Sequence, residues 1–409
     1  MYSMYGIMSE KINKLCRKVL YCWEVSIPSG KFYWREYLLI PFRLPFLFWK
    51  VILQRSFSSE KIILHNIRKR KLHENKPRVL HIISNIEIGG SQKIVFDIAN
   101  GIPEFVADIL DLSTKKYFDG QARKFIDFRS AEDAMRLINH IRPSIGHIHY
   151  YGDYFHMHAY LDVFLRSVTQ VKWIENANNP IPIYPHRNIN QFVYVSNYCR
   201  SIQRKKYLRN TDTVVYPGVD MRQYKKKTQI NEKMVKNIGF VYRLGEDKIG
   251  RNTIELIIKI IKQGGSNFQA HIVGNGVNFF HYIKRVNEEQ IRNQIKFYGS
   301  VNYSDLPMVY DSFDVFIAPV HTESYGVVVP YAMAKGIPVV ANNIGALPEI
   351  LGSCGYLCDT EKEFIERVIW IANNTSEYDR MRQVSHERIK RKFSLDVMLR
   401  SYLKIYRSL

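Results

Sequence analysis

The chain of 409 residues lacks several features that would place it in a protein class at once. No run of about 18 uninterrupted apolar residues occurs, so we expect no conventional membrane span. The first residues lack the apolar segment of a secretory signal, and neither an internal repeat nor a low-complexity tract is present. Because 46% of the residues are hydrophobic, the chain can build sizeable cores. Its length predicts two domains with additions.

Cysteine is also scarce. The five cysteines are odd in number and mostly scattered, at Cys16, Cys22, Cys199, Cys354 and Cys358. The last two form a C-x-x-x-C pair, but no further His/Cys cluster accompanies it, and we therefore expect no metal site. This cysteine usage favours the reducing cytoplasm.

Acidic residues are few in comparison with basic ones, which gives a net charge of +21. Nucleic acid, an anionic membrane or an acidic nucleotide-linked substrate could each balance such a charge. About half of the excess lies between residues 1 and 78, where sixteen Lys/Arg face five Asp/Glu. Because no RNA- or DNA-binding motif occurs, we expect no nucleic-acid partner.

Residues 1–76 form a basic, aromatic-rich extension. Its segment 37–53 is mostly apolar but interrupted by two prolines and Arg43, with Lys31, Arg35, Lys50 and Arg55 nearby. Such a segment could lie in the interface of an anionic membrane. A helix packed against the body of the protein fits the same residues equally well.

One stretch, from Asp314 to Leu351, combines a buried strand, a polar turn, a short helix and a second strand. The apolar run 315–318 predicts a parallel strand, and Pro330 suits the first turn of a helix that Gly336 ends. Residues 337–341 return as the next strand. Open α/β sheets bind ligands at the carboxyl ends of their strands, and Glu323 lies in the turn at such an end.

This stretch resembles the donor-binding signature of the retaining GT-B glycosyltransferases of glycosyltransferase family 4. The matching residues are Glu323, Ala332-Met333-Ala334, Gly336, Pro338-Val339-Val340-Ala341 and Gly345-Ala346-Leu347-Pro348-Glu349. The signature also has a second Glu, and here Tyr331 occupies its place. The resemblance extends over residues 79–409.

The resemblance implies an α/β fold of the GT-B type, in which two Rossmann-like doubly wound domains face a cleft. We predict the extension over 1–76, an N-terminal acceptor domain over 77–220, a linker over 221–237, a donor domain over 238–390 and a helix over 391–409 that crosses back to the first domain. The strand and glycine turn at 79–90 and the strand from 238 would open the two domains.

Two cations at the end of the strand from 238, Arg243 and Lys248, suit a diphosphate, because arginine offers a planar fork and lysine a compact charge. They match the Arg-Leu-x-x-x-Lys motif of the family. We assign catalysis to Arg243, Lys248 and Glu323. The donor-binding residues that the resemblance implies are Gly89, Gly90, Gly274, Gly276, Val301, Ser324, Tyr325, Gly326, Val327, Val328 and Tyr331.

His149 ends a predicted strand of the first domain and could line the acceptor cleft, although a structural histidine fits as well. In relatives the second Glu of the signature binds the ribose hydroxyls. Tyr331 could offer one O–H group there, where a carboxylate offers two acceptors.

The sequence thus predicts a retaining, metal-independent glycosyltransferase without a cofactor, whose donor is a nucleotide-diphosphate sugar. We expect a saccharide or lipid-linked glycan as acceptor, in the synthesis of a bacterial surface polysaccharide or lipopolysaccharide. The enzyme would be cytoplasmic and peripheral on the inner face of the membrane. The alternative is a GT-B scaffold of impaired activity in a membrane glycan-assembly complex.

Overall fold

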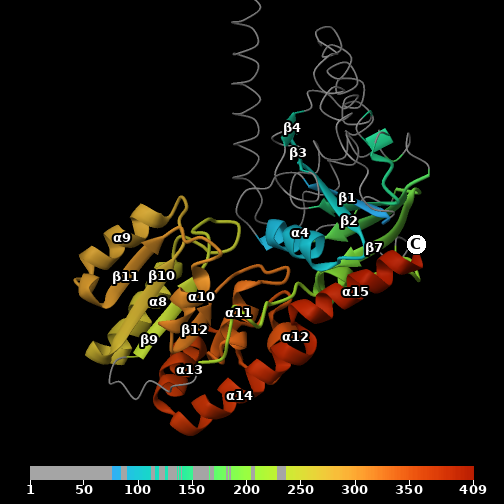
Figure 1. Cartoon of the computed structure of the whole chain (residues 1–409). Helices are drawn as coiled ribbons and strands as arrows, with labels where there is room; N and C mark the ends of the chain where they lie inside the picture. Colours follow the sequence, from blue (N-terminus) through green and yellow to red (C-terminus); the bar gives the residue numbers. More distant parts are fainter. Residues whose placement is uncertain are drawn as a thin grey trace, which may run out of the picture. The chain divides into compact units, whose positions relative to one another are not determined.

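The computed structural model describes most of the chain from residue 76 onward (Figure 1). The described residues are 76–83, 90–111, 116–118, 125–127, 141–150, 170–180, 186–203, 208–227 and 236–409, with single residues at 136, 138, 139, 165 and 183. The predicted extension lies outside these residues, apart from its last position. Among the described helices, none has the length and apolar character needed to cross a bilayer.

The first sheet has eight strands in the order β4-β3-β2-β1-β5-β6-β7-β8. Six are parallel, and β3 and β4 pair antiparallel at one edge. The strands are β1 (Arg78–Ile83), β2 (Val106–Asp111), β3 (Lys116–Phe118), β4 (Phe125–Asp127), β5 (Ile145–Tyr150), β6 (Lys172–Ala177), β7 (Ile189–Tyr194) and β8 (Thr213–Val214), with helices α4 (Gly90–Gly101) and α7 (Asn197–Ser201).

The second sheet has six strands, all parallel, in the order β11-β10-β9-β12-β13-β14. The strands are β9 (Lys236–Val241), β10 (Phe268–Val273), β11 (Ile295–Gly299), β12 (Val315–Ala318), β13 (Val339–Asn342) and β14 (Tyr356–Cys358). The helices are α8 (Thr253–Gly264), α9 (Phe279–Glu288), α10 (Leu306–Asp311), α11 (Val328–Ala334), α12 (Leu347–Leu351), α13 (Glu361–Asn373), α14 (Thr375–Lys392) and α15 (Leu395–Ser408).

The segment from Asp314 to Leu351 folds as its sequence predicts. All four residues of β12 are buried, as expected for a parallel strand that is covered on both faces. Helix α11 has Pro330 in its first turn, and Gly336 follows it with φ +71°, the left-handed conformation that favours glycine after a helix. Strand β13 then continues the sheet beside β12.

Two mainly parallel sheets, each with strand order reversed at its centre, confirm the predicted α/β fold with two Rossmann-like parts. In the second sheet the reversal lies between β9 and β12. The chain adds β10 and β11 on one side of β9 before it returns to form β12 on the other side. Ligands bind beside such a reversal in open α/β sheets. The predicted domain boundaries stay predictions.

The C-terminal helix α15 packs against the first sheet and α4, far from its neighbours in sequence. Buried side chains of α15, among them Met398 and Tyr402, join Val79 and Ile145 of the sheet and Ile98 of α4 in one apolar cluster. Burying a large apolar side chain stabilises a fold by about 1.5–3 kcal/mol. This packing holds the end of the chain on the first sheet.

Candidate functional site

The loops after three neighbouring strands of the second sheet, β10, β9 and β12, carry the predicted catalytic residues and three of the predicted donor-binding glycines. Arg243 and Lys248 follow β9, Gly274 and Gly276 follow β10, and Glu323 follows β12. The loops after β9 and β12 are joined directly, because the backbone N–H of His321 donates to the Lys248 carbonyl at 3.0 Å. The parallel sheet therefore gathers residues that are 80 positions apart in sequence at one edge.

Lys248 and Glu323 form an ion pair, with 2.6 Å between Lys248 Nζ and Glu323 Oε1. The Glu323 side chain is 1% exposed, whereas that of Lys248 is 35% exposed. The backbone N–H of Ser324 also donates to Glu323 Oε1, at 3.1 Å. Glu323 Oε2, in contrast, is buried without a hydrogen-bond partner among the described residues. A buried carboxylate oxygen with no donor is costly, so this atom is available to a ligand hydroxyl.

Arg243 takes no part in the ion pair of Lys248 and Glu323. Its guanidinium bonds the carboxylate of Asp247 instead, and the Arg243 side chain is 70% exposed. An exposed ion pair of this kind contributes only about 0–1 kcal/mol. A diphosphate approaching the loop could therefore displace Asp247 at little cost. Of the three predicted catalytic residues, the structure joins two and places the third in the same loop as Lys248.

The two glycines after β10 allow the loops after β9 and β10 to touch. A Cβ on Gly274, whose φ is +132°, would lie 1.9 Å from the Tyr242 carbonyl oxygen. A Cβ on Gly276 would lie 2.5 Å from the Leu244 carbonyl oxygen. Side chains at both positions would push away the segment that leads to Arg243. These glycines shape the site through backbone packing.

Two other glycines enclose Glu323. A Cβ on Gly326 would lie 2.9 Å from the Glu323 carboxylate, and one on Gly345 would lie 2.2 Å from the Glu323 carbonyl oxygen. Both have positive φ, +75° and +54°. The backbone N–H of Ala346 donates to the same carbonyl oxygen at 3.1 Å. The Gly-x-x-Pro-Glu segment thus fixes the turn that holds Glu323.

The remaining predicted donor-binding residues differ in their surroundings. Val301 and Val328 are half-buried. Ser324 accepts a hydrogen bond at its carbonyl from Ser196 Oγ at 2.6 Å, and the Tyr325 hydroxyl donates to the Pro217 carbonyl at 2.8 Å, so the Tyr325 ring is turned toward the first half of the chain. Gly90, at the start of α4, would bring a Cβ within 3.4 Å of Val327. Gly89 lies outside the described residues.

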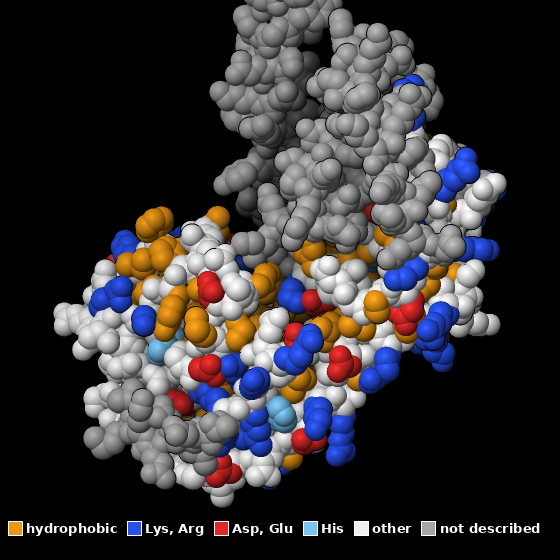
Figure 2. Space-filling model, viewed as in Figure 1, with side chains coloured by type: hydrophobic (Ala, Val, Ile, Leu, Met, Phe, Trp, Pro, Cys, Tyr) orange, Lys and Arg blue, Asp and Glu red, His pale blue; other side chains and the backbone are white. Residues whose placement is uncertain are grey.

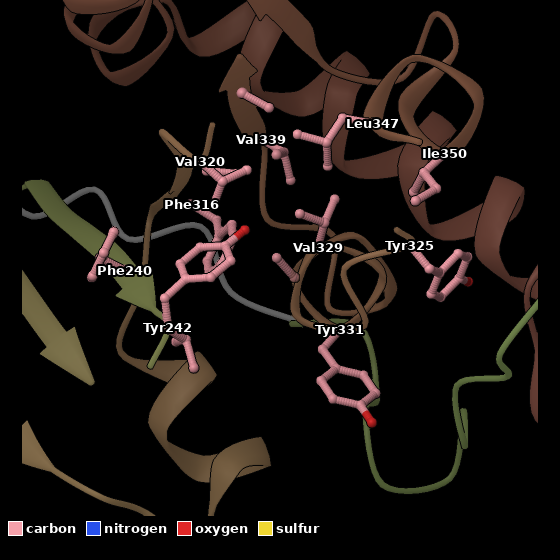
Figure 3. Packing of buried hydrophobic residues seen from close by; sticks show 14 of the residues in the cluster. Phe240, Tyr242, Phe316, Val320, Tyr325, Val329, Tyr331, Val339, Leu347 and Ile350 are labelled. Carbon is pink, nitrogen blue, oxygen red and sulfur yellow. The ribbon is translucent and has the colours of Figure 1, made fainter. Parts of the chain in front are cut away.

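Tyr331, which replaces the second Glu of the signature, is 3% exposed. Its ring stacks on that of Tyr224 with centroids 4.3 Å apart and planes at 8°, and it meets Tyr310 edge-on at 6.3 Å. Figure 3 shows Val329 and Val339 pointing toward one another in the core while Tyr331 projects from the other side of α11. Burial, followed by the neighbouring Tyr224, raises the pKa of Tyr331 well above its ordinary value. The ring therefore anchors the segment after Asp220 to α11.

His149 belongs to a group of three buried histidines on adjacent strands. His81 Nδ1 lies 2.9 Å from His149 Nε2, and one ring nitrogen from each of His81, His147 and His149 lies within 4.8 Å of those of the other two. His149 Nδ1 is buried without a partner among the described residues. The sequence paired His149 with an acceptor cleft and has His147 two residues earlier on the same strand, but it did not indicate that His81 lies beside them.

Both ring nitrogens of His147 are used within the protein. His147 Nε2 donates to Asn176 Oδ1 at 2.9 Å, and the Tyr406 hydroxyl donates to His147 Nδ1 at 2.7 Å. Asn176 Nδ2 in turn donates to the Tyr402 hydroxyl at 2.7 Å. This arrangement leaves His147 no nitrogen for a metal ion and joins α15 to β5 and β6 by hydrogen bonds. The prediction that the chain needs no metal stays a prediction.

The three histidines predict a stability that falls in acid. Burial lowers the pKa of His147 to about 3, and burial together with neighbouring histidines lowers the pKa of His81 and of His149 well below 6.5. Below pH 6.5 the unfolded chain therefore binds protons that the folded chain does not. We expect each ring to lower the free energy of unfolding by up to about 1.4 kcal/mol per pH unit as the pH falls from 6.5 toward 4.

Urea unfolding between pH 7 and pH 4 measures this dependence. His147→Gln should flatten the slope relative to the unchanged chain, whereas His321→Gln, at an exposed position, should not. Burial raises the pKa of Glu175 to about 8, so this residue increases the free energy of unfolding as the pH falls. It does so equally in the unchanged chain and in both variants. Equal slopes for His147→Gln and His321→Gln would show that His147 binds its proton in the folded protein as readily as in the unfolded chain.

Comparison with known proteins identifies the second half of the chain. Residues 220–388 match the family model for glycosyl transferases group 1. We call residues 220–388 the group 1 domain, after the family that they are similar to. They contain β9 to β14 and the three predicted catalytic residues Arg243, Lys248 and Glu323.

Relatives and solved structures extend the likeness beyond the group 1 domain. An uncharacterized 41.2 kDa protein in the cps region of Klebsiella pneumoniae is 30% identical over 210 residues, which cover 49% of this chain and 56% of that protein. A glycosyltransferase structure from Rickettsia africae ESF-5 has a TM-score of 0.65 and 16% identity, over 82% of this chain and 99% of that one. Anabaena Alr3699/HepE, in complex with UDP and glucose, has a TM-score of 0.64 and 14% identity, over 81% and 100%.

The two structures show that both sheets together form the GT-B glycosyltransferase fold. The chain spans between about half and two-thirds of the length of the first curated relatives it matches. The match to the family model lies in residues 220–388, and the likeness in structure covers both sheets.

The structure also reveals a role for Glu349 that the sequence did not. This last residue of the Gly-x-x-Pro-Glu segment accepts from the backbone N–H groups of Asn197 and Tyr198, at 3.0 and 2.9 Å, and from the Tyr216 hydroxyl at 2.8 Å. It thereby ties the group 1 domain to the first turn of α7. A carboxylate suits such exposed backbone donors. In the sequence, Ser196 indicates the start of a helix. No local pattern indicates that Glu349, 151 residues after Tyr198, bonds the first turn of that helix.

Proposed function

We propose that the protein transfers a sugar from a nucleotide-diphosphate donor to a lipid-linked saccharide, with retention of configuration and without a metal ion. The product would be a bacterial surface polysaccharide or lipopolysaccharide. The observation that carries this proposal is the Lys248–Glu323 pair of 2.6 Å at the strand reversal of the group 1 domain. A cation beside an acid with one unpartnered oxygen can bind both the phosphate and the sugar of one donor molecule.

The chemistry follows from where charge develops. Breaking the anomeric C–O bond leaves negative charge on the departing diphosphate, and fixed cations at that place stabilise the transition state. Lys248 and Arg243 would supply them. Glu323 Oε2 would accept a hydrogen bond from a donor-sugar hydroxyl or support the cationic sugar centre. The family resemblance suggests attack on the same face as the leaving group, which gives retention.

Replacing Arg243 by alanine is expected to lower the rate of transfer about 100-fold. The charge-assisted bonds that Arg243 would make to the leaving diphosphate are absent from the free protein, where the side chain faces Asp247 and solvent. Donor hydrolysis across a panel of common sugar nucleotides, followed by the rate with the best donor, measures the effect. Arg391→Ala removes a guanidinium from an 81% exposed side chain of α14 and is the matched control.

A variant Arg243→Ala that retains the full rate would remove the proposed role of Arg243 at the leaving group. Equal losses in Arg243→Ala and Arg391→Ala would point to a general effect of charge. Turnover of none of the donors by the unchanged chain would contradict the proposal itself.

The second candidate is a GT-B scaffold without transfer activity, and the buried stack of Tyr331 on Tyr224 favours it. That ring occupies the place of the carboxylate that binds ribose in relatives. Calorimetric titration with a panel of nucleoside diphosphates distinguishes the two candidates, since a donor site must bind at least one of them. Absence of binding to every member would support the scaffold.

The acceptor and the cellular location follow from weaker features. The relative from the Klebsiella pneumoniae cps region supports a role in surface polysaccharide synthesis. The basic extension, which lies outside the described residues, supports a protein bound peripherally at the inner face of the cytoplasmic membrane. With a nucleotide sugar as substrate, no cofactor would be needed.

A further inference from the structure

A hollow of about 480 Å³ lies apart from the site described above, where the linker from the first sheet meets helices α14 and α15. Its lining residues are Met221, Lys225, Lys226, His386, Lys390, Ser394, Asp396 and Arg400. Four of them are permanent cations and one is an acid. Pockets of 300–1,000 Å³ are of the size that holds small ligands.

The four cations of this hollow have no acidic partner among the residues that the structure describes. Within the part of the chain that the structure describes, none of Lys225, Lys226, Lys390 and Arg400 forms an ion pair. A neighbouring hollow of about 330 Å³ shows the contrast, because there Arg382 donates to the Lys227 carbonyl at 2.5 Å and pairs with an acid. Among the lining residues Asp396 is the single acid beside four cations, so like charges repel one another there, and an anion relieves that repulsion.

Ser394 adds a second, independent observation. It precedes α15, a helix of 14 residues, and its side chain makes no capping hydrogen bond to that helix. Ser394 is only 6% exposed, lines the hollow, and its hydroxyl bonds no residue that the structure describes. Serine at this position usually caps the first turn. Here the hydroxyl remains available beside four cations, whereas the backbone N–H groups of Leu395 and Val397 already donate to carbonyl groups.

We propose that this hollow binds a phosphate-bearing anion. Phosphate oxygens would accept hydrogen bonds from Lys390, Arg400 and the Ser394 hydroxyl, and Lys225 and Lys226 would balance the remaining charge. The chain passes between the two sheets at this place, since Val219 pairs with Ser394 in an isolated bridge. The bound anion would therefore cross-link the linker to helices α14 and α15. Figure 2 shows Lys and Arg side chains gathered over these helices.

Titration calorimetry with pyrophosphate in about 0.15 M salt tests the proposal, since weaker screening would exaggerate surface charge. Lys390→Ala/Arg400→Ala should weaken binding to the hollow at least tenfold. Lys284→Ala/Lys362→Ala removes the same charge from exposed helix positions, at 74% and 86% exposure, and should not. Ser394→Ala changes no charge and should weaken binding about threefold to tenfold, which a diffuse basic surface would not do.

Pyrophosphate should also bind near Lys248 if the proposed function is correct. Binding to the hollow should persist in Arg243→Ala/Lys248→Ala, so the two sites fail or succeed separately. Equal affinities of Lys390→Ala/Arg400→Ala and its control, or an unchanged affinity of Ser394→Ala, would overturn the proposal.

Flotation with phosphatidylglycerol vesicles distinguishes the sources of the phosphate. If flotation falls in Lys390→Ala/Arg400→Ala but not in Lys284→Ala/Lys362→Ala, the ligand is a lipid headgroup. If the two variants float equally while their pyrophosphate affinities differ, the ligand is a soluble phosphate.

Discussion

Replacing Lys248 by alanine is expected to lower sugar transfer about 1,000-fold. Lys248 lies 2.6 Å from the buried carboxylate of Glu323, so its ammonium is held in one place before the donor arrives. A fixed donor in a partly dry site stabilises developing charge by about 2.7–4 kcal/mol. The effect should exceed that of Arg243→Ala, because the Arg243 side chain is 70% exposed and must leave Asp247 first. Single-turnover rates with a saturating donor measure the loss.

The same variant should also lose stability, because Glu323 keeps a buried charge without its partner. Removing one member of a buried pair costs about 3–5 kcal/mol, and the lower end applies because Lys248 is 35% exposed. Lys248→Ala/Glu323→Gln removes the buried charge, so it should regain stability in urea without regaining activity. That split separates the chemical role of Lys248 from its structural one.

Lys262→Ala is the matched control for Lys248→Ala. Lys262 also pairs with a glutamate, Glu289, but on the surface between α8 and the end of α9, where both side chains are partly exposed. It should change neither the rate nor the stability by more than a small amount. A similar rate for Lys248→Ala and Lys262→Ala would contradict the proposed site at the strand reversal.

Local patterns sufficed to predict the strand and helix around Glu323, whereas the family resemblance assigned Arg243 and Lys248 to the same site. The apolar run at 315–318 and the breaks at Pro330 and Gly336 determine β12 and α11, and parallel strands bring the ends of β9 and β12 together. The proximity of Lys248 and Glu323 follows from that topology. Side-chain partners chosen by packing could not be predicted in this way.

Tyr331 and His147 illustrate the limit. Tyr331 stacks on Tyr224, a residue of the linker more than 100 positions earlier, and no periodicity encodes such a pair. His147 is bonded by Tyr406 from the other end of the chain, at a sequence separation of 259. Tyr406 reaches His147 only when α15 returns to the first sheet, and Tyr224 reaches Tyr331 only when the linker packs on α11. Long-range packing decides their surroundings, and local sequence carries little information about it.

Replacing Gly345 by alanine is expected to lower both stability and transfer. The new Cβ would lie 2.2 Å from the Glu323 carbonyl oxygen, at a φ of +54° that alanine disfavours by about 1–2 kcal/mol. Relieving the contact requires the turn at Glu323 to move, which costs about 1–3 kcal/mol more. A displacement of about 1 Å at a catalytic group lowers rates about 100-fold. Urea unfolding and the transfer rate at a temperature where the variant is folded measure the two effects.

Gly299→Ala separates the clash from the backbone conformation. Gly299 also has a positive φ, +66°, but an added Cβ would meet no atom within 4 Å. Its loss of stability should therefore stay near about 1–2 kcal/mol, and that of Gly345→Ala should be larger by the cost of the displaced turn. Equal losses would mean that the turn absorbs the methyl group without moving Glu323. In that case the Gly-x-x-Pro-Glu segment would not hold the acid in place, and Glu323 would depend on Lys248 and Ser324 alone for its position.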